Sequence, residues 1–182
     1  MQVITGKYKG RKLVSPDCAR PTLQRVKQSL FSTISDDVTF DITVLDLFAG
    51  SGALGIECIS RGAKKVYFVD SDKGAVKALN QNLRNIDRAC YQILHEDYLS
   101  ALKKLRGEQF DIIFIDPPYD DEGLLVSCVE IVERFNLLKD GAILVVETSK
   151  KNILQDKIKS CIIEKKKDYG LMEISVLRKV QI

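Results

Sequence analysis

The sequence predicts an α/β fold with a mostly parallel sheet, and three features of the 182-residue chain indicate it. From residue 43 onward, short β-branched runs alternate with segments of helical periodicity, which is typical of parallel strands joined by crossover helices. A glycine-containing segment directly follows the first of these strands. Near the C-terminus two strand-like runs follow one another, and they predict an antiparallel hairpin on the edge of the sheet.

The parallel strands and the helices between them are expected in regular alternation. The strands are expected at Thr43–Leu47, Lys65–Val69, Tyr91–Leu94, Phe110–Ile115 and Ala142–Glu147. The helices are expected at Ala53–Ser60, Lys73–Asn85, Tyr98–Leu105, Glu122–Phe135 and Lys150–Lys159. The final hairpin pairs Cys161–Lys167 with Glu173–Val180 through the turn-like Asp168-Tyr169-Gly170.

The first 40 residues are expected to extend this domain and not to form a second one. Val3–Thr5 and Lys12–Val14 flank a Gly6–Gly10 segment, which predicts a small basic hairpin. After Pro21-Thr22, a helix is expected because apolar residues recur at helical spacing. These apolar residues are Leu23, Val26, Leu30 and Ile34. We therefore expect a single domain, with residues 1–40 as the extension and residues 41–182 as the core.

Composition narrows the classes of protein. The hydrophobic fraction of 45% and the charged fraction of 29% are ordinary for a globular protein. No apolar run approaches the roughly 20 residues of a membrane span, and the N-terminus lacks a secretory signal, so a cytoplasmic protein is expected. The five cysteines include no CxxC pair and His95 is the single histidine, so no metal site is expected.

Charge is unevenly distributed along the chain. The formal net charge is +3, yet the first thirty residues contain seven basic residues and one acidic residue. The basic residues are Lys7, Lys9, Arg11, Lys12, Arg20, Arg25 and Lys27. A basic arm on a near-neutral body favours a polyanionic partner, although a solvated lysine-rich surface would have the same composition.

The glycine segment predicts a cofactor site. Gly50, Gly52 and Gly55 match the G-x-G-x-x-G pattern of dinucleotide enzymes, with Asp70 about 20 residues further on. However, a carboxylate at Asp46 would repel a pyrophosphate and attract an ammonium group, which favours S-adenosylmethionine over a nicotinamide cofactor.

Each acidic residue near this loop has an expected role. Asp70 can accept hydrogen bonds from both ribose hydroxyls. Asp97 can accept from the adenine amino group beside the Tyr98 ring, or can instead cap the helix that follows it. The expected cofactor-binding residues are thus Asp46, Phe48, Ala49, Gly50, Ser51, Gly52, Asp70, Asp97 and Tyr98.

The tetrapeptide Asp116-Pro117-Pro118-Tyr119 predicts the chemistry, because it ends a buried strand where α/β sheets bind ligands. The exocyclic amine of a nucleobase is a poor nucleophile, since its lone pair is delocalised into the ring. The Asp116 carboxylate and the Pro117 carbonyl can each accept an N–H and direct the lone pair toward a methyl donor. The prolines fix the backbone, and Tyr119 can stack on the base. Alone, the tetrapeptide could be a plain turn.

These motifs resemble the class I methyltransferases that carry [DN]-P-P-[YFW], and within them the RsmD family of 16S rRNA guanine-N2 methyltransferases. The segments that resemble this family are Ile4–Leu13, Arg20-Pro21-Thr22, Arg25-Val26-Lys27, Leu30-Phe31 and Asp46–Gly55. The resemblance implies a Rossmann-like fold with a seven-stranded sheet and Asp116, Pro117, Pro118 and Tyr119 as catalytic residues. It also implies that Thr22, with its neighbours, lies by the methionine carboxylate of the cofactor.

The resemblance further implies a substrate and a partner. The substrate would be a guanine in the helix 31 loop of 16S rRNA, within an assembled or assembling 30S particle. Apart from the resemblance, we expect a monomer because nothing in the sequence requires more. The expected RNA-binding residues are Lys7, Lys9, Arg11, Lys12, Arg20 and Arg25.

Three other functions remain open from the residues. An adenine-N6 methyltransferase acting on DNA or RNA can carry the same tetrapeptide. A glutamine-N5 protein methyltransferase typically has Asn at the position of Asp116 and a larger N-terminal helical domain, and neither is seen in this sequence. A non-catalytic RNA-binding protein would use the basic arm alone and would not need Asp116.

Overall fold

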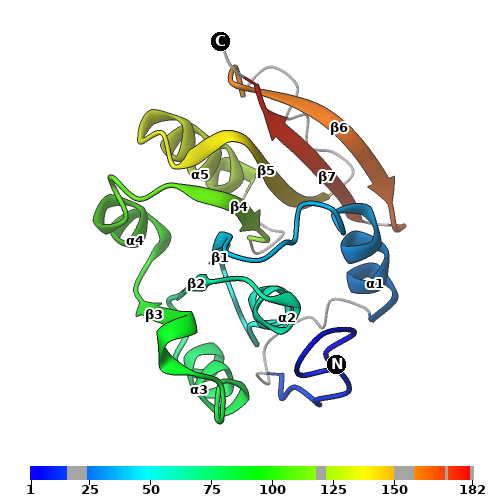
Figure 1. Ribbon diagram of the computed structural model, residues 1–182. Coiled ribbons are helices and arrows are strands. Elements are labelled where there is room, and N and C mark those ends of the chain that lie inside the picture. Colours follow the sequence, from blue (N-terminus) through cyan, green and yellow to red (C-terminus); the bar gives the residue numbers. More distant parts are fainter. Residues whose placement is uncertain (16–23, 118–121, 150–157, 171, 181–182) are drawn as a thin grey trace.

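The computed structural model describes residues 1–15, 24–117, 122–149, 158–170 and 172–180 (Figure 1). Within these residues the strands form one seven-stranded sheet in the order β3-β2-β1-β4-β5-β7-β6. The strands are β1 Thr43–Leu47, β2 Lys65–Asp70, β3 Tyr91–His95, β4 Phe110–Ile115, β5 Leu138–Ser149, β6 Cys161–Asp168 and β7 Met172–Lys179. The first five are parallel, and β7 pairs antiparallel with both β5 and β6. The Rossmann-like sheet and its C-terminal hairpin are therefore confirmed.

The strand order places the binding crevice. From β1 the chain builds outward to β2 and β3, and it then returns to the other side of β1 with β4 and β5. In open α/β sheets, ligands bind beyond the carboxyl ends of the strands where the order reverses. Here that switch point lies between β1 and β4, so the residues that follow these two strands are brought together.

Helices cover both faces of the sheet. They are α1 Gln24–Thr33, α2 Ala53–Arg61, α3 Lys73–Asn82, α4 Tyr98–Lys104 and α5 Glu122–Arg134, with a 3₁₀ turn η1 at Arg88–Cys90. One core cluster joins residues of α1, α2 and α3 to one face, through Val44, Phe114 and Val145. The other joins α4 and α5 to the opposite face. Side chains alternate between the two faces along a strand, so successive residues of a strand belong to the two core clusters in turn.

Some expected boundaries were wrong for identifiable reasons. β5 begins at Leu138 and not at Ala142, because Leu138 already pairs with Phe110 before a register shift. The helix expected at Lys73–Asn85 ends at Asn82, since Asn85 has a φ of 64°, which is incompatible with a right-handed helix. Most of the helix expected at Lys150–Lys159 lies outside the described residues.

The N-terminal hairpin is shorter than expected. Its arms form a single antiparallel bridge, Gln2 with Lys12. The pairing does not extend because the amides of Ile4 and Thr5 donate to the Glu57 carboxylate on α2, at 2.8 and 3.0 Å. Val3 and Leu13 are buried in the core, so the segment is packed against the domain.

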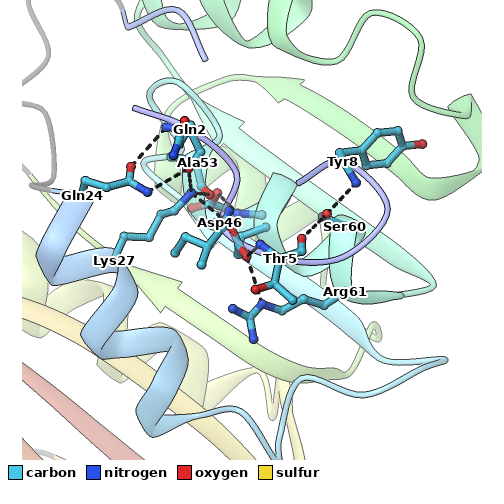
Figure 2. A network of polar contacts seen from close by, with 12 residues as sticks. Gln2, Thr5, Tyr8, Gln24, Lys27, Asp46, Ala53, Ser60 and Arg61 are labelled. Atoms are coloured by element: carbon cyan, nitrogen blue, oxygen red, sulfur yellow. Dashed lines mark hydrogen bonds and ion pairs between the residues drawn. The ribbon is translucent and has the colours of Figure 1, made fainter. Parts of the chain in front are cut away.

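A buried ion pair fixes this extension to the helix that follows the glycine loop (Figure 2). Lys27 of α1 lies 3.1 Å from Glu57 of α2, and both side chains are fully buried. Lys27 also donates to the Gln2 carbonyl at 2.9 Å, and Arg61 pairs with Glu57 at 3.1 Å. The N-terminal segment, α1 and α2 are thus held as one polar unit behind the site.

In the part of the chain that the structure describes, no helix is long and apolar enough to cross a membrane. Cys58 and Cys128 are buried core residues, and no His, Cys, Asp and Glu side chains there gather in a way that could hold a metal ion.

Candidate active site

The loop between β1 and α2 provides an open cradle at Gly50. Phe48, Gly50 and Gly52 all have positive φ, at 67°, 55° and 75°. A Cβ added at Gly50 would meet nothing within 4 Å, whereas one at Gly52 would lie 2.4 Å from a methyl group of Leu79. Gly52 therefore serves close packing, and Gly50 leaves space for a ligand to approach the backbone.

Asp70 shapes this cradle from the end of β2. Its Oδ2 accepts from the Gly50 amide at 2.7 Å, and its Oδ1 accepts from the Asp72 amide at 2.9 Å. The residue thus lies beside the loop, as the sequence predicted. Its contact with ribose hydroxyls stays a prediction.

Asp46 lies under the loop and not at an exposed mouth. Its side chain is 2% exposed, and Oδ2 accepts from the Gly55 amide at 2.9 Å. Burial raises the pKa of Asp46 to about 8, the charges of Asp116 and Asp70 add to the rise, and the bond from Gly55 opposes it. A nearby cation would lower the cost of ionising this buried carboxyl, which fits the expected ammonium of the cofactor.

Phe48 and Tyr98 lie together at the far end of the cradle. Their ring centroids are 6.1 Å apart. Asp97 is exposed and caps α4, since its Oδ1 accepts from the Ser100 amide at 3.0 Å. Hydrogen bonds from Ser100 hold the pKa of Asp97 below its usual value. The capping role is confirmed, and a contact with adenine stays a prediction.

The backbone of the remaining loop residues is fixed by neighbouring elements. The Ala49 amide donates to the Val69 carbonyl at 2.9 Å. The Ser51 carbonyl accepts from the Asn82 side chain at 2.9 Å. Asn82 also exchanges two 2.8 Å hydrogen bonds with the backbone of Val14, so the loop is linked to the end of the N-terminal segment.

Three carboxyl side chains meet on one face of the sheet. Asp46 pairs in register with Phe114 of β4, and Phe114 pairs with Val145 of β5. Asp116 and Glu147 lie two residues beyond these positions, so all three acids share the face that packs against α1 and α2. Burial raises the pKa of Asp116, and burial together with the charge of Asp116 raises the pKa of Glu147.

Sequence reasoning missed Glu147. This residue lines the same pocket as Asp116, and the remaining lining residues are apolar: Leu30, Leu54, Phe114, Ile115, Val145 and Ile174. A signal was present, because Glu147 ends the apolar strand Ala142–Val146. Recognising it required the strand order, which places β5 directly beside β4.

Several predicted site residues lie outside the described chain. Pro117 is described and is buried. Pro118 and Tyr119 of the tetrapeptide, and Arg20 and Thr22 of the N-terminal segment, are not, so their roles stay predictions.

The basic residues of the N-terminal segment are mostly exposed. Lys7, Lys9, Lys12 and Arg25 are exposed to solvent. Arg11 is partly buried, and its guanidinium donates to the Arg84 carbonyl and lies 5.8 Å from the Tyr8 ring centroid. These cations belong to the N-terminal extension and to α1, and their contact with RNA stays a prediction.

The fold and site together define a class of protein. The sheet is Rossmann-like, with a glycine loop after β1, an acid at the end of β2 and Asp-Pro after β4. This combination is typical of a methyltransferase. The family model described as "Conserved hypothetical protein 95" matches residues 1–178. The chain belongs to this family, which is the RsmD family that its motifs resemble.

Individual relatives agree with this assignment. The chain is 34% identical to "Ribosomal RNA small subunit methyltransferase D" of Escherichia coli K12, over 84% of this chain and 76% of the relative. It is 36% identical to the protein of the same name from Haemophilus influenzae, over 82% and 79%. The solved structure of the Escherichia coli protein YhhF superposes with a TM-score of 0.89 at 30% identity, covering 99% of this chain and 98% of that one.

Proposed function

We propose that the protein transfers a methyl group from S-adenosylmethionine to the exocyclic N2 of a guanine in the helix 31 loop of 16S rRNA. The observation that carries this proposal is the position of Asp116 at the switch point, next to the open cradle at Gly50. The relatives named as small-subunit rRNA methyltransferases support rRNA as the substrate.

The residues around the cradle fit S-adenosylmethionine. They present carboxylates from β1 and β2 and a tight glycine turn, which suit an ammonium and a ribose better than a pyrophosphate. When bound, this cofactor supplies a methyl group activated by a sulfonium. Asp46 would hold the methionine ammonium, Asp70 the ribose hydroxyls, and Tyr98 would lie beside the adenine.

Asp116 would act on the substrate amine. Its carboxylate accepts one N–H, which turns the nitrogen lone pair out of conjugation with the ring. As the nitrogen gains the methyl group it becomes positively charged, and it then releases one proton. A carboxylate stabilises that charge and can accept the proton, and its raised pKa makes it a better acceptor near neutral pH.

The expected partner is the 30S subunit or one of its assembly intermediates in the cytoplasm. The exposed Lys7, Lys9 and Lys12 would contact RNA phosphates. Nothing in the proposed chemistry needs a second subunit.

The test supplies labelled S-adenosylmethionine with 30S subunits, naked 16S rRNA or DNA, followed by nuclease digestion and mass spectrometry of the nucleosides. We expect N2-methylguanosine from a ribosomal substrate, mapped to the helix 31 loop. N6-methyladenine as the product would overturn the guanine assignment and favour the adenine-N6 alternative. Label in protein would favour the glutamine alternative.

A further inference from the structure

We propose that Glu147 determines base specificity, accepting the ring N1–H of guanine while Asp116 accepts an N–H of the exocyclic amine. This inference rests on the proposed function, because it assumes a guanine substrate. It assigns a role to a residue outside the tetrapeptide and outside the glycine loop.

The register brings the two carboxyls side by side. Ile115 pairs with Val146, so Asp116 and Glu147 follow at the next step on adjacent parallel strands. Neighbouring strands lie roughly 4.8 Å apart, which lets two carboxylates face two neighbouring donors on one edge of a base. Both residues line one pocket on the β5 side of β4, whereas the glycine loop follows β1 on the other side.

Glu147 is poorly explained by stability alone. Within the described residues, neither Glu147 nor Asp116 has an ion pair or a hydrogen-bond donor. Glu147 is 8% exposed among apolar side chains of α1, α2 and β7. Ionising a carboxyl among apolar side chains costs free energy, which is why burial raises the pKa of Glu147, and a ligand that supplies donors lowers this cost. The neighbouring N–H groups of a base would be such donors.

The donors and acceptors on the edge of the base would let the protein distinguish guanine from adenine. Guanine presents two adjacent donors, N1–H and the N2 amine, to a pair of carboxylates. Adenine and 2-aminopurine have an unprotonated ring N1 next to the amine, and this acceptor would be repelled by an ionised Glu147. A neutral Glu147 could instead donate to it, so discrimination requires the charged form.

The test uses the substrate found above, rebuilt with either guanine or 2-aminopurine at the methylated position. 2-Aminopurine keeps the exocyclic N2 amine but lacks the N1–H. We expect the wild-type protein to prefer guanine at least about 30-fold in kcat/KM, as for a base-edge contact. In Glu147→Gln, whose amide can donate to N1, the preference should fall below about fivefold. Glu108→Gln, an exposed acid at the opposite end of β4, should keep the wild-type preference.

A second measurement needs no variant. Among the described residues, the titratable groups that face Glu147 are Asp116 after β4 and, beyond it, Asp46 on β1, while α1, α2 and β7 contribute Leu30, Leu54 and Ile174. Burial and the charge of Asp116 raise the pKa of Glu147 to about 8, so the preference of the wild-type protein for guanine should be largest above pH 8 and should fall as the pH is lowered through this value. A preference that is unchanged by pH and by Glu147→Gln would overturn this inference, even with guanine N2 confirmed as the target. An adenine product would instead overturn the proposed function.

Discussion

In the proposed function Asp116 contacts the reacting amine, and the structure places it directly after β4 at the switch point, with no hydrogen-bond donor among the described residues. Replacing it with alanine removes the acceptor without touching the glycine loop. We expect Asp116→Ala to bind S-adenosylmethionine within about twofold of wild type by calorimetry. Its kcat should fall at least about 100-fold, the usual cost of losing one preorganised electrostatic contact. Near-normal turnover would remove the proposed role, and Glu108→Ala serves as the control.

The buried carboxyl of Asp46 should lower the stability of the cofactor-free protein at high pH, while it contributes to cofactor binding. Its folded pKa of about 8 lies above the ordinary aspartate value of about 3.9, so the folded protein keeps a proton that the unfolded chain releases between these values. The free energy of unfolding therefore falls as pH rises from about 4 to about 8.

An asparagine at this position has no proton to lose. Asp46→Asn should have a higher Tm than wild type at pH 8 and a similar Tm near pH 4.5, measured by calorimetry without cofactor. It should also bind S-adenosylmethionine at least tenfold more weakly, because the ammonium loses its carboxylate. Asp97→Asn, which changes an exposed helix cap, should shift neither Tm comparably. A Tm difference independent of pH would contradict the assigned titration.

Residue identity predicted part of this site and fold geometry completed it. Asp46, Asp70 and Asp116 could be proposed because each stands in or directly after an apolar run with a glycine or proline nearby. Glu147 also ends an apolar run, but no glycine or proline stands beside it. Its position depends on β5 lying next to β4 and on the face that its register selects, and neither is a local property of the sequence.

At the scale of elements, two glycines of the loop after β1 have different expected roles, Gly52 in packing and Gly50 in cofactor binding. Gly50 and Gly52 both have positive φ, so alanine costs about 1 to 2 kcal/mol of strain at either position. Only Gly52 adds a steric conflict, with Leu79 at 2.4 Å and with Ile56 and Phe68 at 3.3 Å, and overpacking costs about a further 1 to 3 kcal/mol.

The two alanine variants should therefore differ in kind. In urea unfolding, Gly52→Ala should lose clearly more stability than Gly50→Ala. In calorimetry, Gly50→Ala should weaken S-adenosylmethionine binding at least tenfold, because its methyl group occupies the open side of the loop. Normal cofactor binding by a folded Gly50→Ala protein would show that the cradle is not the cofactor site.

The helices and strands of the core could be predicted because their periodicity is a local property of the sequence. The structure of the extension could be predicted only in outline. The backbone of the expected strand at Val3–Thr5 bonds to Glu57, which is more than 50 residues away in the sequence. Lys27 counted as a surface cation in the sequence, yet it is fully buried against the same Glu57. Burial lowers the pKa of Lys27, and the ion pair with Glu57 opposes that shift. Such long-range polar pairs leave no periodic pattern.

At the scale of the whole molecule, the basic extension is fixed relative to the catalytic face. The ion pair of Lys27 with Glu57 holds the extension against α1 and α2 (Figures 1 and 2). Asn82 links its end to the glycine loop, so the exposed lysines have a defined position relative to that loop. A substrate that contacts the extension would therefore lie next to the glycine loop, which is the proposed cofactor site. Local charge, and not the modest net charge of +3, should govern RNA affinity.

This difference between local and net charge can be measured. Lys7→Gln/Lys9→Gln removes two exposed cations of the extension, and Lys103→Gln/Lys104→Gln removes two from α4, which covers the opposite face of the sheet. Both variants lower the net charge equally. If each extension lysine contacts one phosphate of single-stranded RNA, the slope of log affinity against log salt should decrease by about 1.4 in the first variant only. Equal losses in the two variants would mean that RNA responds to net charge, and the extension would then be an ordinary solvated surface.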